Sequence, residues 1–247
     1  MYLHVVFTGK KTTKVTPSTP RRTTPTRPTP RRTTPRRTPT TRRTVTNRPT
    51  GGHGFCNHLY RKIDATMRIS ENDFVFVDNR YVIDGRSGHK MGISRLFPGG
   101  PNMVQAAVYS QRARKAYLFY NQKVWAYSLN SAGRFRLVQN YPKYITNTDG
   151  HNPESAMQFN YGNERLFLIK NGFFMEFDPY YENLAPGRGY RTRDFFANIP
   201  YEIDAAISSA HEIYFIAKKK AYRMSSRDRR VDIQGKPVNL VFNKCRN

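Results

Sequence analysis

The sequence has few acidic residues and no long apolar stretch. Its 247 residues include 42 Lys and Arg but only 17 Asp and Glu, so the formal net charge is +25. An excess of this size favours polyanionic partners. No segment approaches the roughly 18 consecutive apolar residues of a bilayer-spanning helix, so we expect no membrane span. Gly shows no three-residue period, which excludes collagen.

Only two cysteines occur, Cys56 and Cys245. They lie at the two ends of the part of the chain that is rich enough in apolar residues to fold. This placement is the one expected for a single disulfide that joins the ends. Two free, buried thiols are the alternative, because intracellular proteins keep their cysteines reduced. The cysteines by themselves leave both possibilities open.

The sequence motifs of common catalytic sites are also missing. A zinc protease would need His-Glu-x-x-His on a helix, so that two imidazoles share one face with the Glu as base. The His211-Glu212 pair is followed by Phe215 where the second His should stand. We find no Gly-x-Ser-x-Gly elbow, phosphate-binding loop or Cys-x-x-Cys cluster. We therefore expect no catalytic site and no zinc in this chain.

Residues 1–54 have a biased composition. They carry thirteen Lys and Arg and no acidic residue, and residues 11–50 contain sixteen Thr and eight Pro. Frequent Pro and repelling like charges favour an extended, disordered linker that cannot bury a core. Thr and Pro at this density also resemble an O-glycosylated stalk. Residues 11–50 have no aromatic side chain on which bases could stack, so nucleic acid is not an expected partner.

From Phe55 to Asn247, short runs of aromatic and β-branched residues alternate with turn-forming residues, and helical periodicity is almost absent. This pattern predicts an all-β domain. The runs form four pairs, each separated by a short polar segment that favours a β-hairpin turn. The predicted turns are Asp78-Asn79, Asn121-Gln122, Asn171-Gly172 and Lys218-Lys219.

A small residue precedes each hairpin, at intervals of 41, 50 and 49 residues: Ala65, Ala106, Ala156 and Ala205. Small residues suit inner strands that crowd around an axis, and four repeats of this length can close a ring that hides the sheet edges. We predict a four-bladed β-propeller over residues 55–247. Its blades should lie near residues 57–102, 103–151, 152–200 and 201–245. A disulfide between the two cysteines would lock the last blade to the first.

These residues resemble the hemopexin-like family, the four-bladed propellers of matrix metalloproteinases, vitronectin and hemopexin. The most specific segment runs from Leu96 to Ala107 and contains Phe-Pro-Gly followed by Gln-Ala-Ala. It is similar to the family's junction between blades, Phe-Pro-Gly, a spacer and Asp/Glu-Ala-Ala. Asp64-Ala65, Asp204-Ala205-Ala206, Trp125 and the terminal cysteines agree with it. Residues 1–54 resemble the hinge that joins a metalloproteinase catalytic domain to its propeller.

The resemblance implies an ion on the propeller axis. In the family, main-chain carbonyls at the start of each inner strand surround calcium or sodium, and hard cations favour such oxygen ligands. The matching residues here are Asp64, Gln105, Ser155 and Asp204. Chloride is implied near the backbone amides of Thr66, Ala107, Met157 and Ala206. A water-filled axis is the alternative, since Gln105 and Ser155 stand where the family has Asp or Glu.

The resemblance also implies an extracellular binding module. It would be the C-terminal exosite portion of a matrix metalloproteinase, with collagen or tissue inhibitors of metalloproteinases as partners, or a stand-alone vitronectin-like adhesion module. Heme binding through His89 and His151 is a further alternative. It is disfavoured because the family's heme carrier holds heme between two propellers, and this chain has one.

We expect recognition at a basic rim of blade four. This predicted rim consists of Lys218, Lys219, Lys220, Arg227, Arg229 and Arg230. A dense basic surface attracts sulfated glycosaminoglycans or an acidic protein. Arg188, Arg191 and Arg193, after blade three, are the alternative site. The simpler interpretation is a solvated charged surface without a partner.

Overall fold

The computed structural model describes residues 53–146, 152–180, 183–209, 211–225, 227–232 and 234–245. Most of the predicted linker, residues 1–52, lies outside this range. Within the described part of the chain, no helix is long and apolar enough to cross a membrane.

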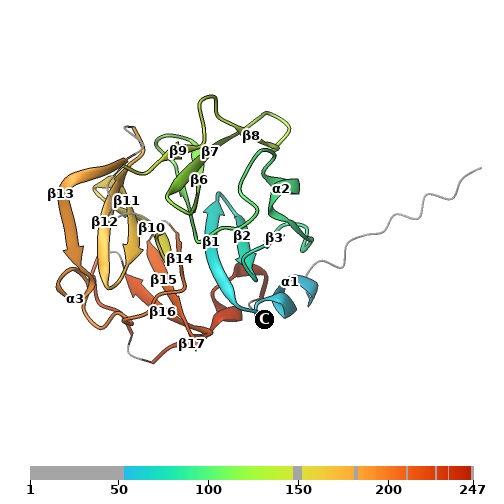
Figure 1. The fold of residues 1–247 in the computed structure, drawn as a ribbon. Coiled ribbons are helices and arrows are strands. Elements are labelled where there is room, and N and C mark those ends of the chain that lie inside the picture. Colours follow the sequence, from blue (N-terminus) through green and yellow to red (C-terminus); the bar gives the residue numbers. More distant parts are fainter. Residues whose placement is uncertain are drawn as a thin grey trace, which may run out of the picture. The chain divides into compact units, whose positions relative to one another are not determined.

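Four antiparallel sheets follow one another along the chain and surround a common centre (Figure 1), which confirms the predicted four-bladed propeller. Blade one contains β1 to β4, which are Ile63–Ile69, Asn72–Val77, Tyr81–Asp84 and Lys90–Gly92. Blade two contains β5 to β8, which are Ala106–Ser110, Lys115–Tyr120, Lys123–Leu129 and Phe135–Leu137. A short strand β9, Lys143–Tyr144, also pairs with β7.

The remaining two blades repeat this order. Blade three contains β10 to β13, which are Ser155–Tyr161, Asn163–Lys170, Phe173–Asp178 and Asn183–Arg191. Blade four contains β14 to β17, which are Ala205–Ser208, Glu212–Ala217, Lys220–Ser225 and Lys236–Pro237. The helical elements are short: α1 His53–His58, α2 Ile93–Leu96, α3 Thr192–Phe195, η2 Val238–Leu240 and η3 Asn243–Cys245.

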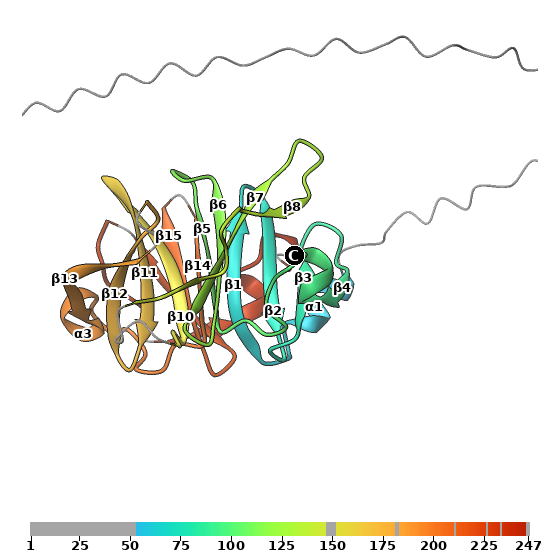
Figure 2. The same cartoon turned by 45° about the horizontal axis from the view of Figure 1, so that its top comes forward.

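The first strand of each blade forms the inner ring. β1 contacts β5 and β14, and β10 contacts the same two strands, so the four inner strands close on themselves (Figure 2). Two consecutive small, buried residues stand in each of them: Ala65-Thr66, Ala106-Ala107, Ser155-Ala156 and Ala205-Ala206. Larger side chains would not fit where four strands approach one axis, as the sequence pattern predicted.

The apolar core is divided into four parts, each between two neighbouring blades. Every sheet is therefore covered on both faces, and β2 is buried along its whole length. A strand covered on both sides reads as a continuous apolar run instead of an alternating one. This explains the run Phe74-Val75-Phe76-Val77.

Tight turns join the second and third strands of each blade. In blades two to four, both turn residues have positive φ, for example 48° at Asn171 and 73° at Gly172. This is the backbone of a two-residue type I′ hairpin, and it confirms the predicted turns. In blade one the connection has three residues, 78–80, and β1 has an irregularity between Ile63 and Ala65.

The two ends of the propeller meet between blades four and one. Phe55 of α1 packs edge-on against Phe242, with 5.6 Å between ring centroids. Cys56 and Cys245 form a disulfide with 5.7 Å between their Cα atoms, as the sequence placement suggested. Blade four is therefore joined to the N-terminal helix α1, beside blade one, by a covalent bond and by an apolar contact.

Breaking this disulfide should destabilise the propeller strongly. It links residues 189 positions apart, and the loop-entropy account of so long a crosslink gives about 5 kcal/mol. Guanidinium unfolding of the Cys245→Ser variant should show a correspondingly lower midpoint than the oxidised wild type.

The double variant Cys56→Ser with Cys245→Ser is the matched control, because it has no thiol left to mispair. Its midpoint should match that of the reduced wild type and should not respond to dithiothreitol. An unchanged wild-type midpoint on full reduction would contradict the proposed role of the disulfide.

Candidate functional site

A cavity of about 440 Å³ opens on the propeller axis at the end where the inner strands begin. We call it the axial mouth. Four carboxylates from three blades line it, namely Asp64, Glu154, Glu202 and Asp204. Gln105 of blade two and Lys62 also line it. The cavity is therefore acidic, although the chain as a whole is strongly basic.

A polar residue at the start of each inner strand, within β1 in blade one and directly before the strand in the other three blades, caps the hairpin turn of its own blade. The side chains of Asp64, Gln105, Glu154 and Asp204 accept hydrogen bonds from backbone N–H groups of the turns. The donors are Asn79 at 2.6 Å, Asn121 at 2.9 Å, Asn171 at 3.3 Å and Lys218 at 2.8 Å. Four equivalent caps place the turns around the mouth and fix the positions of its polar side chains.

The strand register places the repeat-three equivalent of Gln105 one position before the predicted Ser155. Ser155 pairs with Ile169 as Ala106 pairs with Phe119, so Ser155 is equivalent to the small residues of the other blades. The residue equivalent to Gln105 is Glu154. The prediction aligned Ala156 with Ala65, because two small residues in succession make either register plausible in the sequence. The turn-capping side chain was the better signal.

Asp64 is the most buried of these carboxylates, with 5% of its surface exposed. Burial raises the pKa of the Asp64 carboxyl above its usual value, while the Asn79 amide and the Lys62 ammonium oppose this rise. The Lys62 Nζ lies 3.2 Å from Asp64 Oδ1. Burial thus disfavours the ionised form of the Asp64 carboxyl, and a cation close to it would favour that form.

The mouth offers two kinds of oxygen to a cation. In the part of the chain that the structure describes, no group of three or more His, Cys, Asp or Glu side chains could hold a metal. The equivalent main-chain positions are Asp64, Gln105, Glu154 and Asp204.

A separate, much smaller cavity of about 10 Å³ lies among the inner strands. Hydrogen bonds between inner strands cross it, such as Thr66 Oγ1 to the Ala206 carbonyl at 2.8 Å. Thr66, Ala107, Met157 and Ala206, the residues predicted to lie near chloride, all line this small cavity, although by strand register the equivalent of Ala107 in blade three is Ala156. Met157 belongs to the apolar core between blades three and four.

Further cations lie near the mouth, and one of them, Lys218, has its Nζ 3.1 Å from Oε2 of the mouth residue Glu202. Most of them lie in or beside the capped turns. Arg191 and Arg193 flank Thr192, which donates its N–H to the turn residue Gly172. We call them the mouth cations: Arg80, Lys123, Lys170, Arg191, Arg193, Lys218, Lys219 and Lys220. Arg191 and Arg193 thus share this face with the three lysines of blade four. The side chain of Arg188 lies outside the described residues.

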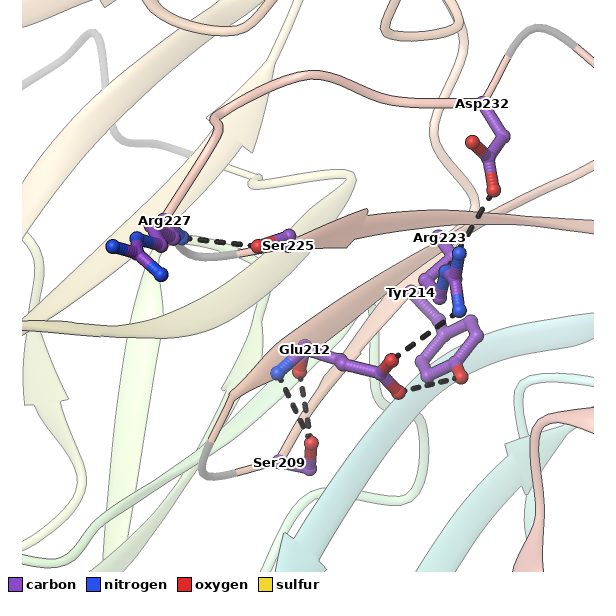
Figure 3. A network of polar contacts seen from close by, with 7 residues as sticks. All are labelled: Ser209, Glu212, Tyr214, Arg223, Ser225, Arg227 and Asp232. Atoms are coloured by element: carbon purple, nitrogen blue, oxygen red, sulfur yellow. Dashed lines mark hydrogen bonds and ion pairs between the residues drawn. The ribbon is translucent and has the colours of Figure 1, made fainter.

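The predicted basic rim does not form one patch. β16, Lys220–Ser225, separates the Lys218-Lys219 turn from Arg227, and six residues of strand span roughly 17 Å. Figure 3 shows Arg227 beyond Ser225, whose Oγ accepts its N–H at 3.2 Å, with Arg223 further along the strand. Arg229 packs its guanidinium over the ring of Phe195, at 5.4 Å from the centroid. The sequence grouped these residues because they are close along the chain.

Arg223 and the two histidines considered for heme are not among the residues described as lining the mouth. Arg223 lies between two carboxylates, 3.5 Å from Glu212 and 3.7 Å from Asp232 (Figure 3). His89 is exposed between β3 and β4. His151, its proposed partner for heme, lies outside the described residues.

Comparison with known proteins supports the fold alone. No family model matches the sequence, and no curated protein matches it. Among solved structures, the hemopexin fold protein CP4 from cow pea superposes with a TM-score of 0.58 at 16% identity, covering 72% of this chain and 94% of that one. A 2S albumin seed protein from Dolichos gives 0.60 at 17% identity, with coverages of 74% and 97%. A plant lectin with two metal-binding sites from Cicer arietinum gives 0.57 at 14%, with 73% and 94%.

Removing the charge of Asp64 should change how stability depends on pH. A raised pKa means that the folded state holds the proton more tightly than the unfolded state. Stability is therefore lost as pH rises from the ordinary value near 4 through the raised pKa. Asp64→Asn keeps an acceptor for the Asn79 amide and has no charge, so its stability should fall less over this window.

Urea unfolding between pH 3 and pH 7 would measure the difference. Asp204→Asn is the matched control, since it removes the same group from the equivalent but more exposed position of blade four. Parallel pH profiles for wild type and Asp64→Asn would contradict the interpretation of Asp64.

Proposed function

We propose that this propeller is an extracellular binding module and that its mouth face binds sulfated glycosaminoglycans. The observation that carries this proposal is the gathering of the mouth cations, from four blades, onto one face. The disulfide between Cys56 and Cys245 is compatible with an oxidising, extracellular environment.

The charge distribution favours a ligand that lies across this face. The carboxylates sit in the axial mouth, and the mouth cations lie around them. A flexible polyanion can contact the surrounding cations without entering the acidic centre. Each contact releases counterions from the polymer, so several exposed lysines and arginines together give strong binding at low salt.

Exposed aromatic side chains lie among these cations. Tyr201 is 63% exposed and its ring centroid lies 5.9 Å from the Arg193 guanidinium, and Phe173 is 43% exposed next to Arg191 across the strand pair. Aromatic and Arg side chains are common at contact surfaces. One structural neighbour is named as a plant lectin, so a saccharide ligand has a precedent among proteins of this fold.

A structural calcium ion in the axial mouth is part of the proposal, with sodium as the alternative. Calcium accepts main-chain oxygens at flexible distances. The carbonyls of Asp64, Gln105, Glu154 and Asp204 would hold it. The ion would offset the charge of the surrounding carboxylates, among them the buried Asp64.

A matrix metalloproteinase exosite is a second candidate function. The Thr- and Pro-rich composition of residues 11–50, which resembles a hinge, favours it. Its partners would be collagen or tissue inhibitors of metalloproteinases. A coding segment for His-Glu-x-x-His upstream in the same gene would support this candidate over a stand-alone adhesion module.

Neutralising two mouth cations should weaken heparin binding. Lys219 and Lys220 are both exposed, so Lys219→Gln with Lys220→Gln should leave the fold intact. The variant should elute from heparin at lower salt. For polyanions, each lost contact reduces the slope of log affinity against log salt by about 0.7–0.9.

The control is Arg227→Gln with Arg230→Gln, which removes the same charge at the opposite end of β16. Both variants keep residues 1–54, so the nonspecific contribution of that segment is the same. The control should elute close to the wild type. If the two variants elute together, the charge acts without a defined site and the proposal fails.

Calcium should raise the melting temperature of the propeller. A ligand that binds only the folded state stabilises it by mass action, by about 2.7 kcal/mol at one hundred times its dissociation constant. Asp64→Asn should keep the response, because the proposed ligand is its main-chain oxygen. Magnesium, which demands tighter octahedral geometry, should have less effect. Identical thermal unfolding in calcium and in chelator would exclude the ion.

A further inference from the structure

A second cavity, of about 710 Å³, lies between blades one and two. We call it the Trp125 pocket. Its lining includes Arg80, Asn102, Tyr120, Asn121, Lys123 and Trp125. Met103 and Tyr120 line both this pocket and the axial mouth, so the two cavities adjoin on the same face.

Gly100 lines the pocket, and Gly99 precedes it in the same loop. Gly99 has a φ of +72°, which side-chain-bearing residues rarely adopt. A Cβ at Gly100 would collide with the hydroxyl of Tyr127 and lie 2.8 Å from the carbonyl oxygen of Phe97. Glycine at both positions lets the loop lie directly on blade two, and Asn102 at its end remains exposed beside the pocket.

The charged residues in the lining are all cations. Arg80 and Lys123 line the pocket, and no carboxylate does. Within the described residues, neither of the two forms an ion pair. Lys123 is half-buried, and its Nζ lies 4.8 Å above the centroid of the Tyr144 ring, which holds the ammonium in place. Two cations without a carboxylate partner favour an anionic ligand, whereas the axial mouth would repel one.

The remaining lining has the chemistry of a saccharide site. Tyr120 and Trp125 supply apolar surface for the C–H face of a sugar, and the side-chain amides of Asn102 and Asn121 can bond hydroxyl groups. Tyr120 is fixed by its hydroxyl, which lies 3.4 Å from the sulfur of Met103. A volume near 700 Å³ is within the usual range of ligand pockets and can hold a disaccharide.

We propose that the Trp125 pocket binds a sulfated disaccharide unit. Lys123 and Arg80 bind the sulfate groups, the two amides bind hydroxyls, and the aromatic side chains contact the sugar ring. This inference rests on the proposed function for its class of ligand. It assigns two of the mouth cations, Lys123 and Arg80, to a pocket that recognises a short unit, while the others, Lys219 and Lys220 among them, attract the polymer.

Trp125 provides the measurement, because it is the one tryptophan of the chain. It is 8% exposed, so it contributes to the core while its accessible surface faces the pocket. Titration of the full-length protein with a sulfated heparin disaccharide should change the tryptophan emission in a saturable way. The desulfated disaccharide should bind at least tenfold more weakly, and adenosine monophosphate should have little effect.

Lys123→Gln should weaken the sulfated disaccharide about tenfold, the usual loss for one charge-assisted hydrogen bond. Lys90→Gln is the matched control, since Lys90 also holds its ammonium over a tyrosine ring, 4.1 Å from the Tyr81 centroid, but lies outside the pocket. Its affinity should equal that of the wild type. Arg80→Gln, at an exposed position, should also weaken binding and gives a second variant that leaves the core untouched.

Unchanged emission, an equal response to the desulfated sugar, or a stronger response to the nucleotide would each overturn the inference. Failure of the proposed function is distinguishable, because it appears as heparin elution that ignores Lys219 and Lys220. The disaccharide titration depends on Lys123 and Arg80 instead. Heparin retention with silent Trp125 emission would leave the proposed function standing without the pocket.

Discussion

Closure of the ring is the constraint on which this structure depends. Each sheet is apolar on both faces, so each needs a neighbour on either side. Four sheets in an open row would leave two apolar faces in water. Val75 of blade one and Ile216 of blade four are buried in one cluster only because the last blade returns to the first. The disulfide and the Phe55–Phe242 contact lie at this junction, where a loss of contact would open the ring.

Ring closure also creates the axial mouth. A polar residue at the start of each inner strand caps the turn of its own blade, which is a local requirement. Because four such strands surround one axis, these caps are brought together even though they are 41 to 50 residues apart. The acidic character of the mouth is thus a consequence of turn capping repeated around a ring.

The same geometry separates the charges of the face. The carboxylates that cap the turns line the axial mouth, while most of the cations in and beside the turns do not line it. Centre and periphery therefore favour ligands of opposite charge. The Trp125 pocket lies at the boundary and combines two cations with aromatic side chains. A protein with a net charge of +25 can in this way present distinct sites instead of a uniform basic surface.

The sequence alone determined the class of fold, the four repeats, the hairpin turns and the pairing expected of Cys56 with Cys245. These features depend on local patterns, which are short runs of apolar residues, turn formers and a repeat length. It did not determine which residues meet. Ser155 was taken for Glu154, because either register of the pair Ser155-Ala156 fits a small-residue pattern, and only strand pairing with Ile169 decides it. The residues of the predicted basic rim lie in two separate places for a similar reason. Arg227 is near Lys220 in the chain, but strand β16 places it at the other end of the blade. Arg193, distant in the sequence, instead follows Thr192, whose N–H bonds the turn residue Gly172.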